Sequence, residues 1–337
     1  MKNILSVREV KQLPKNSEFI VNGVVSKFTR RKDRNNASFW EMTISDSSGD
    51  IDGKIWQASG WRNTQGGDDF PIDPDNCGLR FEGSSVQAVG IVAEFREQIQ
   101  YNFSEICYLD QDEYPPKMFT RQSPVKAEIL EDLFRKLIAQ ISHKEIYDFV
   151  DAVFFKHGLW EKFKSWPAAV TMHHAYTGGL LEHSVSVAIG AMDLARHYSV
   201  FKIPVNMNLV IAGALLHDIG KLESYSMSPA PQATLSGVAI EHITLGYGMF
   251  MRFAEIENLS KDITLALGHI ISSHHGRLEY GSPVLPATPE AFIVSAADNV
   301  DFELAYWKAQ IDGLNSDADF TDYLPAIERR LWRGIKL

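Results

Sequence analysis

A long apolar stretch, NLVIAGALL, runs over residues 208–216 and ends in the adjacent pair His217-Asp218. The apolar run predicts a buried helix, and adjacent His and Asp rarely close such a helix without serving a site. Further imidazoles and a carboxylate occur in the same part of the chain: His183, His242, His274, His275 and Asp298. No cysteine lies among them, which excludes a thiolate-rich zinc site. Imidazole with carboxylate suits Mn, Fe, Co, Ni or Zn, so the pattern predicts a metal site.

The order of these residues, with Lys221 three positions after Asp218, resembles the HD superfamily of metal-dependent phosphohydrolases. More narrowly, the motifs GGLLEHS, LLHDIGK, SHHGRLEYGSP and ADNVD, behind an N-terminal segment of OB type, resemble the YhaM-type 3′-to-5′ exoribonucleases. The resemblance spans nearly the whole chain. It implies a phosphodiesterase that acts on single-stranded RNA, with single-stranded DNA left open, and releases nucleoside 5′-monophosphates.

We assign the candidate ligands to two divalent transition-metal ions that share Asp218. The first ion is expected on His183, His217, Asp218 and Asp298, and the second on Asp218, His242, His274 and His275. Mn, Fe, Co or Ni fits these ligands, and Zn is compatible with them. Two ions roughly 3.5 to 4 Å apart can share a hydroxide that attacks the phosphate. The alternatives left open are a single metal, ligation by only one of His274 and His275, and a hydrogen-bonded cluster without metal.

Lys221 joins Asp218 as the second expected catalytic residue, because its compact positive charge can meet a phosphate oxygen as negative charge builds. By resemblance, Arg277 and the SHHG loop lie beside the substrate. His174 is a third candidate for the substrate pocket, although a capping or surface role for His173 and His174 is equally compatible with the sequence.

The length of 337 residues suffices for two ordinary domains, and 45% hydrophobic residues with 23% charged ones are typical of a globular protein. No apolar run reaches the roughly 18 residues of a membrane span. Charges interrupt the short apolar stretch near the N-terminus, so no signal-peptide core is expected. Cys77 and Cys107 do not indicate a disulfide framework. We therefore expect a cytoplasmic protein without a membrane partner, and leave open whether it forms a homo-oligomer.

Short strands separated by turns fill the first third of the chain. In ASFWEMTISD, for example, Trp40, Met42 and Ile44 alternate with Phe39, Glu41 and Thr43, the period of a half-buried strand. Five such strands fit a small barrel of OB type or an SH3-like barrel, and the resemblance favours the OB type. We expect a nucleic-acid-binding domain over residues 1–115, followed by a proline-containing linker at about 110–123.

Helices are expected throughout the second domain, residues 124–337, which makes the fold class multidomain: a five-stranded OB-type β-barrel followed by an all-helical HD domain. Apolar residues at helical spacing place these helices at about 125–156, 179–198, 207–220, 240–257, 261–274, 289–312 and 320–334. The helix that carries His217 and Asp218 must end or distort there if both are to ligate, and Gly220 is expected to end it.

Contact with single-stranded nucleic acid is expected in the N-terminal domain. The net charge of -10 argues against a global positive field, but the segment KFTRRKDR, residues 27–34, offers a local basic track that includes Arg30 and Arg31. Rings on the expected strands could stack on bases, and we single out Phe28 and Trp40 among Phe39, Trp56, Phe95, Tyr101 and Phe103. Core packing of each ring, and a solvated hairpin loop for the basic segment, are the competing interpretations.

The sequence is also compatible with other functions: a nucleotide or cyclic-nucleotide phosphohydrolase, a diiron oxygenase, or a non-catalytic nucleic-acid-binding protein. SHHG is followed by EYGSP, so the GYP signature of cyclic-di-GMP enzymes is absent. Lys221 and the full ligand set argue against a non-catalytic protein. Two departures from the family pattern, Glu241 before His242 and Phe302-Glu303 after ADNVD, add negative charge or remove positive charge near the site and bear on the substrate.

Overall fold

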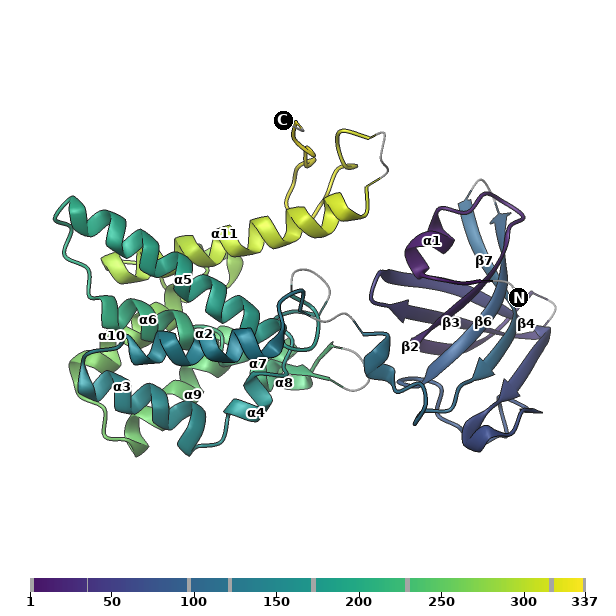
Figure 1. Cartoon of the computed structure of the whole chain (residues 1–337), viewed down its shortest axis with the longest axis horizontal. Coiled ribbons are helices and arrows are strands. Elements are labelled where there is room, and N and C mark those ends of the chain that lie inside the picture. Colours follow the sequence, from purple (N-terminus) through teal and green to yellow (C-terminus); the bar gives the residue numbers. More distant parts are fainter. Residues whose placement is uncertain are drawn as a thin grey trace. The chain divides into compact units, whose positions relative to one another are not determined.

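The computed structural model describes residues 3–34, 36–95, 98–120, 123–170, 174–227, 231–314 and 318–335. The chain forms two compact units, one built from residues up to 120 and the other from residue 123 onward. In Figure 1 the first unit is purple to blue and consists mainly of strands, and the second is teal to yellow and consists of helices. Among the described residues, no helix combines the length and the apolar character needed to cross a membrane.

The N-terminal unit is a mixed β-sheet. Its elements are β1 (Ile4–Leu5), α1 (Val7–Lys11), β2 (Glu18–Lys32), β3 (Ser38–Asp46), β4 (Gly49–Asn63), β5 (Phe70–Pro71), β6 (Ser85–Phe95) and β7 (Gln98–Tyr108). β2 pairs antiparallel with β3 and with β6, β3 pairs antiparallel with β4, and β6 antiparallel with β7. β4 and β7 pair in parallel. Each of these five strands therefore pairs with two of the other four, and the pairing returns to β2. β1 adds to β2, and β5 adds to β4.

The interior of this unit follows the alternation in the sequence. Trp40, Met42 and Ile44 of β3 are buried in the apolar core, whereas the residues between them face outward or are half-buried. A Cβ atom on Gly53 would lie 2.1 Å from the ring of Phe103, so only glycine lets this ring fill the core beside β4. Packing between the strands therefore depends on one small residue opposite one large ring.

The second unit is a helical domain. Its helices are α2 (Ala127–Ala139), α3 (Lys144–Asp151), α4 (Trp160–Phe163), α5 (Gly179–Val200), α6 (Met207–Leu216), α7 (Lys221–Ser224), α8 (Leu235–Ile240), α9 (His242–Ile256), α10 (Lys261–Ser273) and α11 (Pro289–Asp312). A π-helical turn, Ala152–Lys156, extends α3, and the short strands β8 (Tyr225–Ser226) and β9 (Gln232–Ala233) form a hairpin. α6 is buried on all sides over Val210–Leu216, because α5, α10 and α11 pack around it.

Besides the helix expected over 207–220, which ends at Leu216, two expected helices differ from the structure. The helix expected over 125–156 is interrupted between α2 and α3, where the Asn208 side chain accepts hydrogen bonds from the backbone N–H groups of Ser142 and His143. The helix expected over 320–334 is wrong: this segment forms turns and isolated β-bridges, Phe320 with Trp332 and Leu324 with Arg329. Pro325 lies within it, and a proline disfavours helical backbone at the residue before it.

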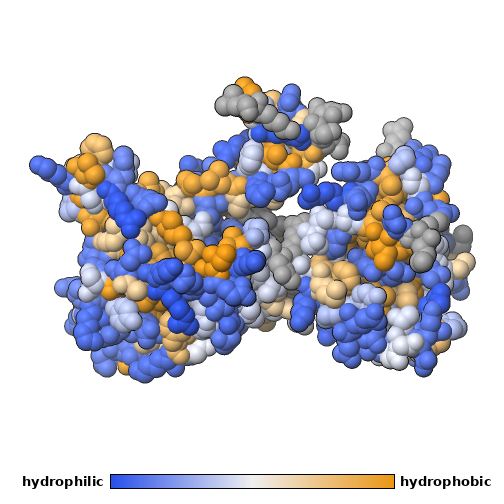
Figure 2. Space-filling view, in the orientation of Figure 1, coloured by the Kyte–Doolittle hydropathy of each residue, from blue (hydrophilic) through white to orange (hydrophobic). Residues whose placement is uncertain are grey.

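Apolar side chains also reach the surface. Figure 2 shows hydrophilic residues over much of the visible face of each unit, with apolar patches between them.

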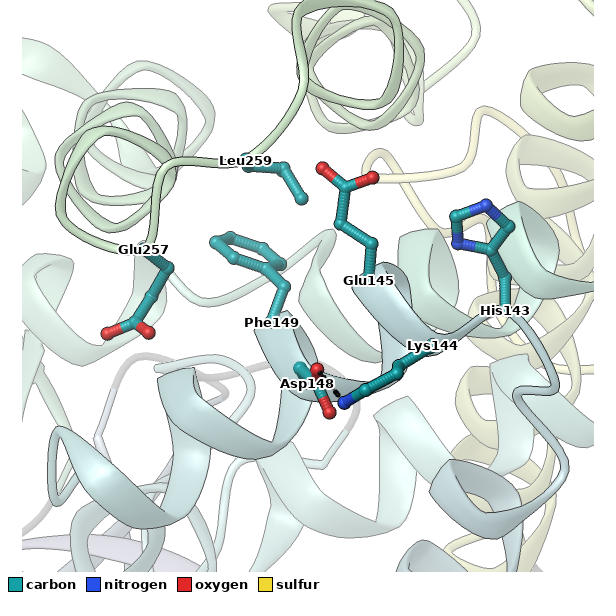
Figure 3. A pocket seen from close by; sticks show the side chains of 7 residues that line it. All are labelled: His143, Lys144, Glu145, Asp148, Phe149, Glu257 and Leu259. Atoms are coloured by element: carbon teal, nitrogen blue, oxygen red, sulfur yellow. Dashed lines mark hydrogen bonds and ion pairs between the residues drawn. The ribbon is translucent and has the colours of Figure 1, made fainter.

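The helical domain has a pocket of about 450 Å³ at the start of α3, which Figure 3 shows in close-up. It is lined by His143, Lys144, Glu145, Asp148, Phe149, Glu257 and Leu259, and none of the candidate ligands belongs to it.

Candidate metal centre

His217 and Asp218 occupy the turn between α6 and α7. α6 ends at Leu216, and His217 is its C-terminal cap, so the helix ends four residues before Gly220 rather than at it. Gly220 has φ −65, which is not the left-handed conformation expected of a helix-ending glycine. Its role is close packing: a Cβ there would lie 2.0 Å from the backbone oxygen of His242. The turn thus brings His217, Asp218 and the start of α9 together.

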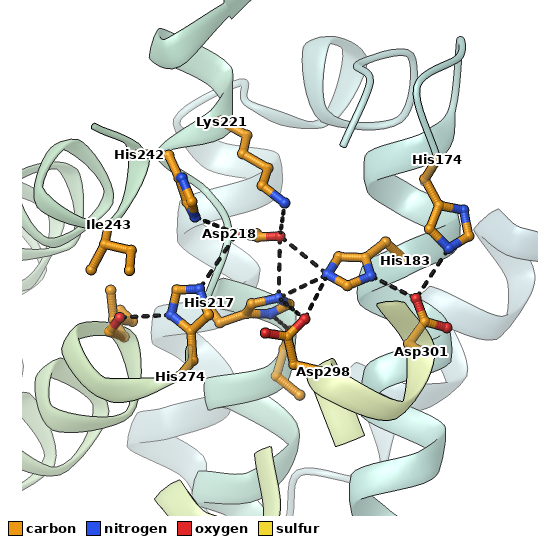
Figure 4. Close-up of polar contacts among 12 residues, drawn as sticks. His174, His183, His217, Asp218, Lys221, His242, Ile243, His274, Asp298 and Asp301 are labelled. Carbon is orange, nitrogen blue, oxygen red and sulfur yellow. Dashed lines mark hydrogen bonds and ion pairs between the residues drawn. The ribbon is translucent and has the colours of Figure 1, made fainter. Parts of the chain in front are cut away.

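The Asp218 carboxylate lies between two groups of histidines (Figure 4). Its Oδ2 atom is 3.2 Å from Nε2 of both His183 and His217. Its Oδ1 atom is 3.3 Å from Nε2 of His242 and 3.6 Å from Nε2 of His274. The two oxygens of the Asp218 carboxylate therefore face different histidine groups: Oδ2 faces His183 and His217, and Oδ1 faces His242 and His274.

Asp298 and His275 complete the two groups. Asp298 Oδ1, from α11, lies 3.2 Å from His183 Nε2 and 3.8 Å from His217 Nε2. His275 joins the other group, where one nitrogen from each of His242, His274 and His275 lies within 4.8 Å of the others. The structure thus brings together all seven residues expected as ligands.

The rings are held so that Nε2 points into the centre. The Nδ1 atoms of His217, His274 and His275 donate to the backbone carbonyls of Ala214 (2.7 Å), Ile271 (2.8 Å) and Tyr280 (2.6 Å). Because the Nδ1 proton of each ring is hydrogen-bonded to a backbone carbonyl, the Nε2 lone pair is available to a metal.

Three buried atoms at the centre form no hydrogen bond with any described residue: Asp218 Oδ1, His242 Nε2 and His274 Nε2. Polar atoms buried without partners are rare in folded proteins and each requires an explanation. Imidazole nitrogens and carboxylate oxygens are ligands of divalent transition metals. The donor set and its orphaned atoms therefore fit bound metal ions.

The charges at the centre influence one another. Burial alone raises the pKa of the Asp218 carboxyl, but Lys221 and His217 beside it lower that pKa well below its usual range. Burial and the neighbouring His274 and His242 lower the pKa of His275 to about 4. At neutral pH, Asp218 is therefore ionised and His275 is a neutral base, the protonation states that metal binding requires.

Lys221 is buried at the start of α7, with its Nζ atom 2.6 Å from Asp218 Oδ2. Burial lowers the pKa of this amine, but the Asp218 charge raises it above its ordinary value, so it is a cation. The Lys221 backbone oxygen accepts a hydrogen bond from Trp166 Nε1 (3.0 Å). A fixed positive charge therefore borders the carboxylate that both histidine groups face.

Asp301 is a site residue that the sequence reasoning missed. Its Oδ2 atom accepts hydrogen bonds from His183 Nδ1 (2.7 Å) and from His174 Nε2 (3.0 Å). The signal was present, because Asp301 follows Asp298 by three residues and so lies on the same face of α11. Asp301 orients His183 as the backbone carbonyls orient the other rings.

His174 does not take the expected place beside a substrate. It is 7% exposed, its Nε2 contacts Asp301, and its Nδ1 lies 2.7 Å from the Tyr176 hydroxyl, which in turn donates to Glu182. Both of its ring nitrogens are engaged within the protein, so the expectation of substrate contact through them is wrong. His173 lies outside the described residues.

Arg277 is an exposed cation shortly after the His274-His275 pair. Gly276 before it has φ +74, a conformation that favours glycine, and a Cβ at this position would lie 2.6 Å from Ser295 Oγ. The Arg277 guanidinium lies over the Tyr280 ring, 5.5 Å from its centroid. Its expected role at the substrate stays a prediction.

The N-terminal unit corrects the choice of stacking residues. Trp40 is 6% exposed and packs against Trp61, so this ring belongs to the interior and is wrong as a base-stacking platform. Phe28 is partly buried and contacts Trp61 and Phe81 at the edge of the core, so its stacking role stays a prediction. Phe39 and Trp56 form an outward pair instead: they are cross-strand neighbours with ring centroids 5.2 Å apart, and Trp56 is 41% exposed.

Arg30 and Arg31 are exposed and ion-paired. Arg30 lies 3.0 Å from an Asp75 oxygen, and Arg31 lies 2.9 Å from a Glu41 oxygen. Surface pairs of this kind contribute little to stability and exchange readily, so the two guanidinium groups remain accessible to another anion.

The HD domain family model matches residues 180–303, which include every candidate ligand from His183 to Asp298. A second model, that of the TraI_2 helicase group, matches residues 117–224. The chain is 27% identical over 297 residues to the 3′-5′ exoribonuclease YhaM of Geobacillus sp. (strain WCH70), an alignment that covers 88% of this chain and 85% of that protein. The chain thus contains an HD domain and is similar to YhaM over most of its length.

Two solved structures give weaker likenesses. The second OB-fold domain of replication protein A from Methanococcus maripaludis matches at 13% identity and a TM-score of 0.22, covering 32% of this chain and 94% of that one. The protein ygiW from E. coli matches at 16% identity and a TM-score of 0.20, covering 31% of this chain and 87% of that one. Scores this low carry no argument about the fold.

Proposed function

We propose that this HD-type, YhaM-like protein is a metal-dependent phosphodiesterase that removes nucleotides from the 3′ end of single-stranded RNA and releases nucleoside 5′-monophosphates. The observation that carries the proposal is the placement of Asp218, whose two oxygens face two separate groups of buried histidines. A carboxylate shared in this way suits a pair of divalent ions, as in many enzymes that cleave phosphate esters.

Seven residues would hold the two ions: His183, His217 and Asp298 on one side of Asp218, and His242, His274 and His275 on the other. The ligand chemistry favours Mn, Fe, Co or Ni, with Zn compatible. When bound, the ions supply an activated water and positive charge for the attacked phosphate. The neutral His275 and ionised Asp218 are already in the protonation states that this binding needs.

Lys221 and Arg277 would act on the substrate. The Lys221 ammonium is buried, so its charge is weakly screened and acts strongly on a phosphate oxygen that approaches Asp218. Arg277 is exposed and can bind a phosphate further along the strand. In this assignment Asp218 and Lys221 are the catalytic residues, and Arg277 holds the RNA.

The N-terminal unit, residues 1–115, would hold the rest of the strand as an OB-type barrel, with the phosphodiesterase domain at 124–337. Taken in chain order as strands one to five, β2, β3, β4, β6 and β7 pair as 1-2-3-5-4 and back to 1, a closed circuit suited to a Greek-key barrel. The outward pair Phe39 and Trp56 would offer a stacking surface for bases, and Arg30 and Arg31 would supply phosphate contacts.

The test is a digest of RNA labelled at its 5′ end in the presence of Mn²⁺. A 3′-to-5′ exonuclease shortens the labelled strand one nucleotide at a time, which gives a ladder of labelled products. It releases nucleoside 5′-monophosphates, which mass spectrometry identifies. A 3′-terminal phosphate block and Asp218→Ala serve as controls, and single-stranded DNA tests the choice of sugar. Hydrolysis of free or cyclic nucleotides with intact RNA would overturn the proposal in favour of a nucleotide phosphohydrolase.

A further inference from the structure

Glu241 has a backbone conformation that is rare for a residue with a side chain. Its φ of 74 and ψ of 152 fall near a region of backbone space that is essentially confined to glycine. Among the non-glycine residues of the described chain with positive φ, Glu241 has the largest value. Such a conformation is strained and persists only where the surrounding contacts compensate.

The Glu241 carboxylate makes two contacts that this conformation permits. One oxygen, Oε2, accepts a hydrogen bond from the backbone N–H of Ile243 (3.1 Å) and caps the start of α9. The other, Oε1, accepts from Nδ1 of His242. The cap alone does not account for the second contact, which acts on a candidate ligand.

The contact with His242 resembles one on the other side of the centre. His183 Nδ1 donates to the Asp301 carboxylate, whereas His217, His274 and His275 donate to backbone carbonyls. Each histidine group therefore contains one ring held by a carboxylate. An anionic acceptor fixes the tautomer and makes the opposite nitrogen a stronger donor to a metal.

We propose that Glu241 is a positioning residue for the second metal ion: it holds His242 with Nε2 toward Asp218 Oδ1, 3.3 Å away, and strengthens that ligand. The inference rests on the proposed dinuclear function. Asp301 is the matching residue for the first ion. The strained backbone at Glu241 is maintained because it lets one carboxylate serve the helix cap and the ligand together.

Two substitutions separate the ligand role from the cap. Glu241→Gln keeps the shape and one acceptor oxygen but loses the negative charge that faces His242. Glu241→Gly removes both contacts and the strain. Thr288→Ala is the control, because the Thr288 hydroxyl caps α11 by accepting from Ala291 N (3.2 Å) and contacts no candidate ligand.

The full-length protein, stripped of metal by chelator and dialysis, is titrated with Mn²⁺ by calorimetry, and bound ions are counted by elemental analysis. We expect two sites in the wild type and a loss of about 10- to 100-fold in one affinity for both Glu241 variants. Asp301→Asn should weaken the other site. Thr288→Ala should lower the melting temperature and leave both affinities unchanged.

Two results overturn the inference, and they can be told apart. If the wild type and both Glu241 variants bind two ions with equal affinities, Glu241 is only a helix cap, and the dinuclear function stands. If the wild type binds a single ion, the dinuclear assignment fails and the role of Glu241 fails with it. Circular dichroism of each variant verifies that the domain is folded.

Discussion

The Nε2 atoms of His183 and His217 lie 3.1 Å apart, and both rings are fully buried. Nδ1 of His183 already donates to Asp301, and Nδ1 of His217 to the Ala214 carbonyl. Two neutral rings in this arrangement present facing lone pairs, which repel unless a proton or a metal ion lies between them.

Removal of metal should therefore destabilise the helical domain. A ligand present at 100 times its Kd stabilises the folded state by about 2.7 kcal/mol, and chelation removes that contribution. We expect the melting temperature to fall with EDTA and to recover with Mn²⁺ in scanning calorimetry. In Asp218→Asn, which lacks the shared charge, EDTA should have little effect. An equal EDTA response in that variant would show that metals bound elsewhere stabilise the protein.

Lys221→Ala should lower kcat by about 100-fold, the usual cost of losing one preorganised contact to the transition state. The metal content should stay near that of the wild type, because Lys221 is not a ligand. Single-turnover digests of labelled RNA and elemental analysis measure the two quantities. Lys221→Arg keeps the charge but changes the shape, and should recover part of the rate. An unchanged kcat would remove Lys221 from the chemistry.

Trp56→Ala should weaken the binding of long RNA, because a base stacked on an aromatic ring contributes about 1 to 3 kcal/mol. We expect a higher KM for a long strand and an unchanged rate on bis-p-nitrophenyl phosphate, which does not need the N-terminal unit. Phe70→Ala is the control, since Phe70 is similarly exposed at 44% but lies on β5 opposite Asn63, whereas Trp56 lies opposite Phe39. Equal effects of the two substitutions would argue against a stacking surface at Trp56.

Charge reversal at Arg30 and Arg31 should flatten the salt dependence of RNA binding. Each phosphate contact with a single strand contributes a slope of about -0.7 to the plot of log affinity against log salt concentration. Fluorescence anisotropy over a salt series should give a shallower slope for Arg30→Glu with Arg31→Glu than for the wild type. Reversal of Arg135, an exposed cation of α2 that lies over the Phe155 ring, is the control. A slope equal to that of the wild type would exclude both arginines as phosphate contacts.

The candidate ligands could be predicted from their order along the chain, because each is an unusual polar residue in or beside an apolar helix. The roles of Asp301 and Glu241 could not, since they depend on which helix faces His183 and on one backbone angle at the start of α9. Asp301 had a spacing signal relative to Asp298. The position of Glu241 directly before His242 placed a negative charge near the site, but the sequence did not indicate its contact with His242 Nδ1.

The N-terminal strands show a different limit. Alternation separates Trp40 from Phe39, but it does not say which face of the strand is the interior. Glu41 and Thr43 share the face of Phe39, and these polar neighbours were the available signal that Phe39 points outward and Trp40 inward. The type of a ring therefore does not decide its exposure, because its neighbours on the same face of the strand do.

Gly220 limits which mutations the metal centre tolerates. Every other amino acid has a Cβ, and at this position that atom would meet the backbone of His242 at 2.0 Å and of Gly246 at 2.4 Å. Any mutation that replaces this glycine therefore forces the start of α9 away from the turn that carries Asp218. A substitution at position 220 is therefore neutral only if α9 shifts at the same time.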